Sequence, residues 1–147
     1  MSERDRLVPL IGQRITGAWI ATDSKGDWFN DEPVVIGLGD IQLEIAVYQV
    51  GLLAITWNSI DLSRCANWLG CWDDLEVRWQ SATSRMFALA IGQRILRIHV
   101  ADGPSGVDAL QFEHDNGVLT LYNACDELGA GDQPLDPNNY RLHSITD

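Results

Sequence analysis

Apolar and polar residues alternate with a period of two in several short stretches of the chain. The clearest case is residues 42–48, where Leu43, Ile45 and Val47 fall on one face of an extended chain and Glu44 falls on the other. This pattern predicts a half-buried strand. Similar strand-like runs occur at 14–20, 34–36, 94–100, 110–112 and 118–121. The chain is therefore predicted to be mainly β, with a small helical contribution (β-rich α+β).

Short turn sequences separate two pairs of these runs. Gly39-Asp40 lies between 34–36 and 42–48, and Asn116-Gly117 lies between 110–112 and 118–121. Both central residues of a type I′ turn have positive φ, which Asn and Gly adopt readily. The two turns predict β-hairpins, and hence antiparallel sheets.

The chain also contains an internal repeat. The segment Ile-Gly-Gln-Arg-Ile at 11–15 recurs without change at 91–95, and residues 51–61 can be aligned with residues 117–127. We therefore predict a single domain over 1–147, built from two diverged tandem half-domains at about 7–61 and 87–127. The first half-domain is longer because of an insertion, 23–33, whose Asp, Gly, Asn and Pro residues are typical of a loop.

The connector between the halves, 62–86, departs from the strand pattern. A short helix is predicted within it, because four apolar residues have helical spacing: Cys65, Trp68, Leu69 and Trp72. The connector contains Trp68, Trp72 and Trp79, which either pack in the core or form an exposed binding surface, and core packing is the commoner use. The tail, 128–147, is predicted to be rich in loops, particularly at 129–139.

Charge narrows the classes of partner. The chain has 10 Lys and Arg against 21 Asp and Glu, a net charge of −11, and its basic residues form no cluster along the sequence. Duplex DNA and anionic membranes attract clustered basic residues, so neither is an expected partner. A basic protein is the favoured partner, although acidity can also serve solubility alone. Because the sequence has neither a long apolar run nor a secretory signal, we expect a cytoplasmic protein.

Cysteine and histidine give no metal-binding pattern. Cys65, Cys71 and Cys125 are odd in number, and neither they nor the three histidines have the spacing of a metal site. We expect reduced thiols that fill small gaps in the core, in preference to reactive thiols. No cofactor and no metal are predicted.

Paired carboxylates are the remaining candidates for chemistry. Asp73 and Asp74, with Glu76 nearby, form one group, and Asp126 and Glu127 form another. Such pairs can serve acid–base catalysis or bind a cation, yet a run of acidic residues is more often a solvated face. The sequence has no Gly-x-Ser-x-Gly motif, and Gly37-Leu38-Gly39-Asp40 lacks the features of a phosphate-binding loop. No catalytic residue is predicted.

The segment Leu-Thr-Leu-Tyr-Asn-Ala-Cys-Asp-Glu, residues 119–127, resembles a late strand of bacterial immunity proteins, which accompany secreted toxins. The resemblance implies a non-enzymatic inhibitor that binds its toxin directly. In such a protein the partner-binding residues would be the two acidic groups and the neighbouring tryptophan: Asp73, Asp74, Glu76, Asp126, Glu127 and Trp72.

Two other functions remain open at this point. The chain could be a structural or regulatory binding module with a different partner, including a second copy of itself paired through exposed strand edges. It could also be a small enzyme or ligand-binding barrel with a site assembled from scattered residues such as His99, His114 and Asp126.

Overall fold

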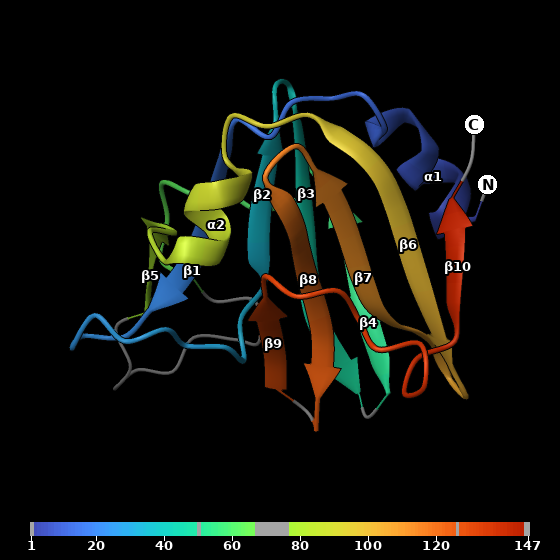
Figure 1. Cartoon of the computed structure of the whole chain (residues 1–147). Coiled ribbons are helices and arrows are strands. Elements are labelled where there is room, and N and C mark those ends of the chain that lie inside the picture. Colours follow the sequence, from blue (N-terminus) through green and yellow to red (C-terminus); the bar gives the residue numbers. More distant parts are fainter. Residues whose placement is uncertain (1, 50, 67–76, 126, 146–147) are drawn as a thin grey trace.

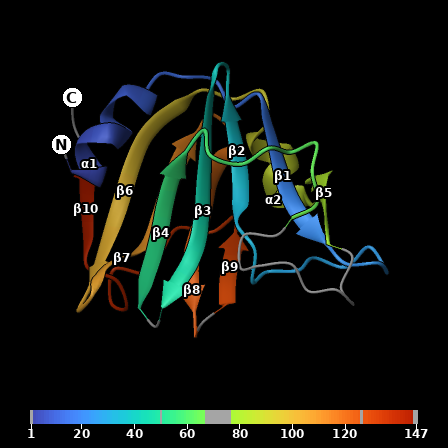
Figure 2. The same ribbon diagram turned by 180° about the vertical axis from the view of Figure 1, so that it is seen from behind.

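A computed structural model describes residues 2–49, 51–66, 77–125 and 127–145 of the chain. Within these ranges, ten strands form two five-stranded antiparallel sheets, which pack face to face (Figures 1 and 2). The predicted mainly β fold class is confirmed. None of the helices in these ranges combines the length and the apolar character needed to cross a membrane.

The first sheet has the strand order β4-β3-β2-β1-β5. Its strands are β1 (Gly17–Thr22), β2 (Val34–Leu38), β3 (Ile41–Gln49), β4 (Leu52–Trp57) and β5 (Arg78–Ser81). Gly39 and Asp40 form the turn between β2 and β3, so the predicted hairpin is confirmed. Most of the predicted helix at 65–72 lies outside the described residues, as do Trp68 and Trp72.

The second sheet has the order β10-β6-β7-β8-β9. Its strands are β6 (Ile95–Gly103), β7 (Gly106–His114), β8 (Gly117–Ala124), β9 (Glu127–Gly131) and β10 (Leu142–Ile145). The hairpin between β7 and β8 is confirmed, but its turn residues are Asp115 and Asn116, and Gly117 already pairs with His114 as the first residue of β8. The prediction of a loop from 129 was wrong for the end of β9, because Gly129 and Ala130 pair with the edge of β8 although their own strand propensity is low.

The two halves of the chain follow the same order of elements. Each has a short helix, a link containing the repeated pentapeptide, a meander of four strands, and a later strand that pairs beside the first strand of the meander. The helices are α1 (Glu3–Leu7), continued by the 3₁₀-helix η1 (Val8–Leu10), and α2 (Arg85–Ala90). Positions 80 residues apart share burial at 2% exposure or less: Leu7 with Phe87, Leu10 with Ala90, and Ile15 with Ile95. These equivalences support the tandem-repeat prediction.

One part of the repeat alignment is wrong. The alignment of 51–61 with 117–127 pairs β4, the fourth strand of its meander, with β8, the third strand of the other. The structural counterpart of β8 is β3. Both β4 and β8 follow a hairpin glycine and alternate in hydrophobicity, which explains why two non-equivalent strands resemble each other in sequence.

The two repeated segments pair with each other. An antiparallel bridge joins Arg14 to Arg94, and the Arg14 guanidinium also donates to the Gly92 carbonyl. Backbone N–H to O=C hydrogen bonds of 2.7–2.9 Å run on both sides of this bridge: Gly12 to Ile95, Gly92 to Ile15, Ile15 to Gln93, and Ile95 to Gln13. The links therefore cross at a quasi-twofold axis, and this crossing joins the two halves in addition to their common core.

Replacing Gly12 by alanine should lower the free energy of unfolding of the protein about as much as replacing Gly92 by alanine. Both glycines have strongly positive φ, +90° and +87°, and a Cβ atom would meet nothing within 4 Å at either position. The cost is therefore backbone conformation alone, about 1–2 kcal/mol per site. Urea unfolding of the two variants measures it, with Gln13→Ala as the control at an exposed neighbour. A difference above about 1 kcal/mol between the two variants would show that the links are not equivalent.

The helices complete the core where the sheets do not face each other. Figure 1 shows α2 and α1 on opposite sides of the molecule, and α2 contacts β8. Leu7 of α1 and Phe87 of α2 belong to the same buried cluster as the inward-facing residues of both sheets. Each helix therefore closes one open side of the sandwich.

Candidate partner-binding surface

Of the six predicted partner-binding residues, Glu127 lies within the described part of the chain. It is the first residue of β9 and is exposed. Asp73, Asp74, Glu76, Trp72 and Asp126 lie outside the described residues. The predicted contact between the two acidic groups and a partner therefore stays a prediction.

The insertion loop of the first half lies against β9 of the second half. The Leu128 N–H donates to the Asn30 carbonyl at 3.3 Å, and Asn30 Nδ2 donates to Glu127 Oε2 at 3.5 Å. Asp31, next to Asn30, is exposed, and so is Asp27, which lies earlier in the same loop. We call these three residues, Asp27, Asp31 and Glu127, the acidic seam.

The loop has a defined conformation. Asp23 Oδ1 accepts backbone hydrogen bonds from Lys25 at 2.9 Å and Asp27 at 3.0 Å, which form a tight turn at its tip. The Phe29 N–H then donates to the Ala21 carbonyl at 2.8 Å, and Trp28 packs against the main core. The sequence indicated the loop but not its contact with β9. The signal in the sequence that could have indicated an acidic surface here is the set of three aspartates within nine residues, Asp23, Asp27 and Asp31.

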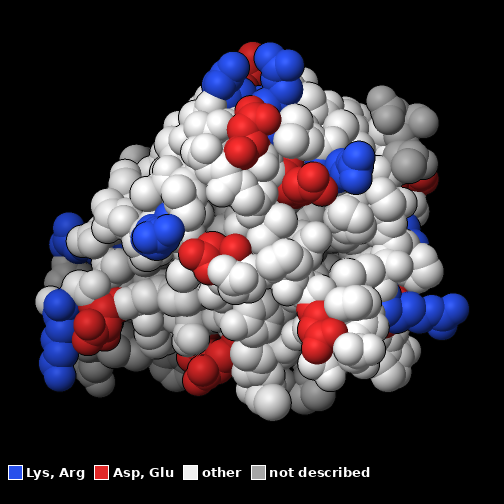
Figure 3. Space-filling view, viewed as in Figure 1, with Lys and Arg blue, Asp and Glu red and all other residues white. Residues whose placement is uncertain are grey.

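The charged surface is mixed on one face of the molecule. Figure 3 shows acidic side chains dispersed among basic ones over this face of the molecule, with no continuous acidic patch. On this face, therefore, the acidic side chains would act on a partner mainly as a long-range field, and a specific contact must come from local geometry.

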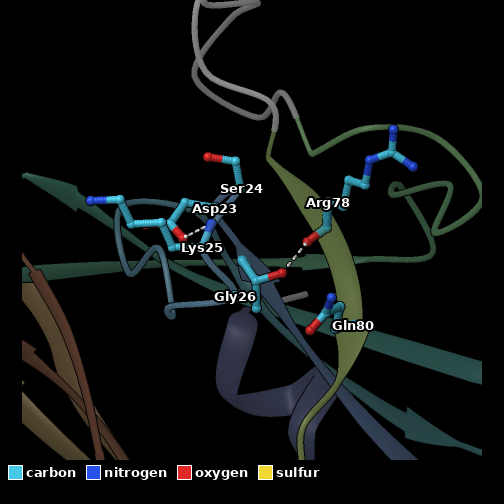
Figure 4. A pocket seen from close by; sticks show the side chains of 7 residues that line it. Asp23, Ser24, Lys25, Gly26, Arg78 and Gln80 are labelled. Atoms are coloured by element: carbon cyan, nitrogen blue, oxygen red, sulfur yellow. Dashed lines mark hydrogen bonds between the residues drawn. The ribbon is translucent and has the colours of Figure 1, made fainter.

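A polar depression beside the loop does not form an anion site. It has a volume of about 370 Å³ and is lined by residues from the loop and β5, including Lys25 and Arg78. Figure 4 shows these two side chains pointing away from one another. A phosphate or carboxylate ligand would need them to converge, and they do not.

Glu44 is a buried acidic residue whose carboxylate has several hydrogen-bond donors around it. It is 1% exposed, on the outer face of β3, under the segment that follows β4. Its carboxylate accepts hydrogen bonds from Thr56 Oγ1 at 2.7 Å and from Gln42 Nε2 at 2.9 Å. It also accepts from the backbone N–H of Ser59 at 3.1 Å and from the Ser59 hydroxyl. Burial alone would raise the pKa of Glu44, but these bonds from Ser59, Gln42 and Thr56 outweigh it and hold the pKa below its ordinary value. The prediction of a half-buried strand is therefore wrong here, since both faces of β3 are covered at this position.

The histidines proposed for an assembled catalytic site do not meet. His114 lies on the core face of β7, where burial lowers its pKa and its Nδ1 accepts from the Asn116 N–H at 3.1 Å. His99 lies between the core residues Ile98 and Val100 on β6, and so faces the opposite side of the sheet. Among the described residues, no group of three or more His, Cys, Asp or Glu is arranged to hold a metal ion.

The cysteines differ from the core-filler prediction. Cys65 and Cys125 are exposed and free, whereas Cys71 lies outside the described residues. Cys125 has a φ of +53° in the turn between β8 and β9, and Cys65 is in the segment that follows β4. Since both residues are exposed, neither fills a gap in the core. Trp79, by contrast, packs with Ala21, Ala66 and Val77, as the core interpretation of the connector tryptophans expected.

Comparisons with protein-family models, with curated proteins and with solved structures found no match.

Proposed function

We propose that this protein is a non-enzymatic inhibitor of the immunity type, which binds a basic protein by direct contact. The acidic seam is the observation that carries the proposal. It consists of exposed carboxylates from both halves of the chain, two on the insertion loop and one at the start of β9, the strand to which Asn30 of that loop is bonded. The net charge of −11 would attract a basic partner toward such a surface.

The seam also adjoins residues predicted from the sequence. Glu127 is itself one of the acidic residues predicted to contact a partner, and it directly follows Asp126 in the chain. A protein that binds through carboxylates at a loop and a strand end needs no catalytic group, which agrees with the implied inhibitor.

The test begins with capture of a binding protein from the native host and reconstitution of the purified pair. Association of that pair should slow as salt rises, because the Debye length shortens to about 8 Å at physiological ionic strength. A partner with no basic surface, or an association rate independent of salt, would overturn the proposal.

Neutralising the acidic seam should slow association more than neutralising equal charge elsewhere. The variant carries Asp27→Asn, Asp31→Asn and Glu127→Gln, and we expect roughly a three- to tenfold lower association rate at low salt. The control carries Asp40→Asn, Glu113→Gln and Asp115→Asn, near the turns at the opposite end of the sheets. Stopped-flow measurements compare the two. Equal slowing would show that only net charge matters and that the seam is not the contact.

A further inference from the structure

A cavity of about 440 Å³ lies on the outer face of the second sheet, near the edge of β9. Its floor is formed by β8 and β9, and its wall is the segment that leads from β9 to β10. The residues that give it chemical character are Thr120, Tyr122, Asp132, Asp136 and Tyr140. The cavity lies at the end of the strand that begins with Glu127, about 13 Å along the strand from the acidic seam.

The floor depends on a close approach between a tyrosine and a glycine. A Cβ atom at Gly129 would lie 2.3 Å from Cε2 of Tyr122, so the aromatic ring rests directly on the backbone of β9. The ring is thereby held in place while it also lines the cavity.

The wall is fixed by hydrogen bonds. Buried Gln111 Oε1 accepts from the Leu135 N–H at 2.8 Å, which anchors the segment to the sheet. The Asp136 carbonyl accepts from the Tyr140 N–H at 2.9 Å, and Asp136 Oδ1 accepts from the Asn138 N–H at 2.9 Å. These bonds form the cavity in the absence of a ligand, which lowers the entropic cost of binding.

The lining favours a planar cation. It combines two phenol rings with two carboxylates, and it includes no Lys or Arg. Arg85 from α2 already lies at the rim, with its Nε 4.0 Å from Asp132 Oδ2. Burial, with smaller effects from Asp108 and Tyr122, raises the pKa of Tyr140, so its phenol stays neutral at physiological pH.

We propose that this cavity binds the guanidinium group of an arginine side chain presented by the basic partner. This inference rests on the proposed function and names the group that the partner supplies. A guanidinium can stack on an aromatic ring while its N–H donors reach carboxylates, a combination that the ammonium of lysine cannot reproduce.

The test is an NMR titration of the whole protein, labelled with ¹⁵N, with Nα-acetyl-arginine amide as the probe. We expect saturable shifts of the amide signals of Gly131, Gln133 and Leu135. Nα-acetyl-citrulline amide, which is planar but neutral, should bind at least roughly threefold more weakly, and so should the corresponding lysine amide. Equal binding of citrulline, or shifts at other residues only, would overturn the proposal.

Variants then assign the binding to the cavity. Asp132→Asn and Tyr140→Leu should each weaken arginine-amide binding roughly two- to fivefold, as loss of one ion pair or one cation–π contact implies. Because Asp132 is only half-buried and Asn is close to it in size, its variant keeps the test valid even where Tyr140→Leu perturbs the wall. Arg85→Gln removes the competing guanidinium and should tighten binding roughly twofold. Unchanged affinity in both the Asp132 and the Tyr140 variants would contradict the proposal.

The two proposals fail in distinguishable ways. If the seam variant weakens binding of the purified partner but Asp132→Asn leaves it unchanged, the arginine pocket is wrong and the proposed function stands. If arginine amide binds in the cavity but the purified partner binds independently of salt and of both sets of variants, the proposed function is wrong and the cation site stands alone.

Discussion

The Phe87→Ala variant is expected to lose about 3–5 kcal/mol of unfolding free energy. Phe87 is 2% exposed and packs in the cluster that joins both sheets. Truncation removes its contacts and leaves a cavity, because helix α2 is held in place by its link and cannot collapse fully into the space. Denaturant unfolding gives the value directly.

Its equivalent in the first half provides the comparison. Leu7→Ala should cost about 2–5 kcal/mol, since Leu7 is also fully buried. Arg85→Gln is the matched control on α2, where the side chain is exposed, and should change stability by less than about 0.5 kcal/mol. A loss below about 1 kcal/mol for Phe87→Ala would show that α2 does not contribute to the common core.

The Glu44→Leu variant is expected to lose about 1–3 kcal/mol. The substitution removes the acceptor of the Ser59 N–H and of the Ser59 and Thr56 hydroxyls. Ser59 is exposed and can bond to water instead, whereas the half-buried Thr56 hydroxyl loses its partner beside a buried position. Glu44→Gln keeps one acceptor oxygen and should cost about 1–2 kcal/mol. Asp40→Asn, an exposed acid at the β2–β3 turn, is the control and should be nearly neutral.

The same residue predicts a dependence on pH. Since the pKa of Glu44 is lower in the folded state, its stabilisation is fully present above the unfolded-state pKa, about 4.3, and is lost as pH falls through the folded-state pKa. The stability difference between wild type and Glu44→Gln should be constant near neutral pH and should shrink below about pH 4. A difference that grows in acid would mean that the folded-state pKa of Glu44 is raised.

Local patterns predicted the parts of the fold that depend on neighbouring residues. Period-two alternation at 42–48 and the Asn116-Gly117 pair are local signals, and the strand and the hairpin that they predict both form, although Glu44 is buried and the turn lies one residue earlier. By contrast, β9 and β10 are short and contain few strong strand formers, and they become strands because β8 and β6 offer free edges. Residues 14–15 were predicted to open a strand, but they form the link between the halves, since their hydrogen-bond partners come from residues 92–95.

The candidate site was less predictable, because it depends on contacts between distant segments. The acidic residues of the insertion loop could be counted, but nothing local indicates that Asn30 reaches Leu128. The arginine pocket needed the contact of Tyr122 with Gly129 and the bond from Leu135 to Gln111, and residues 129–139 had been predicted as loop alone. Sequence patterns identify strands and turns, whereas a cavity arises from packing between them.

The crossing of the two links affects how the chain can fold as it is made. The hydrogen-bond partners of Gly12 and Ile15 are Ile95 and Gln93, so the first link stays open until about 80 further residues have been synthesised. At about 5–20 residues per second this takes roughly 4–16 s, during which α1 has no second half to pack against. The apolar inner face of the first sheet stays uncovered during this time, and synthesis of the second half sets the earliest moment at which the two sheets can pack.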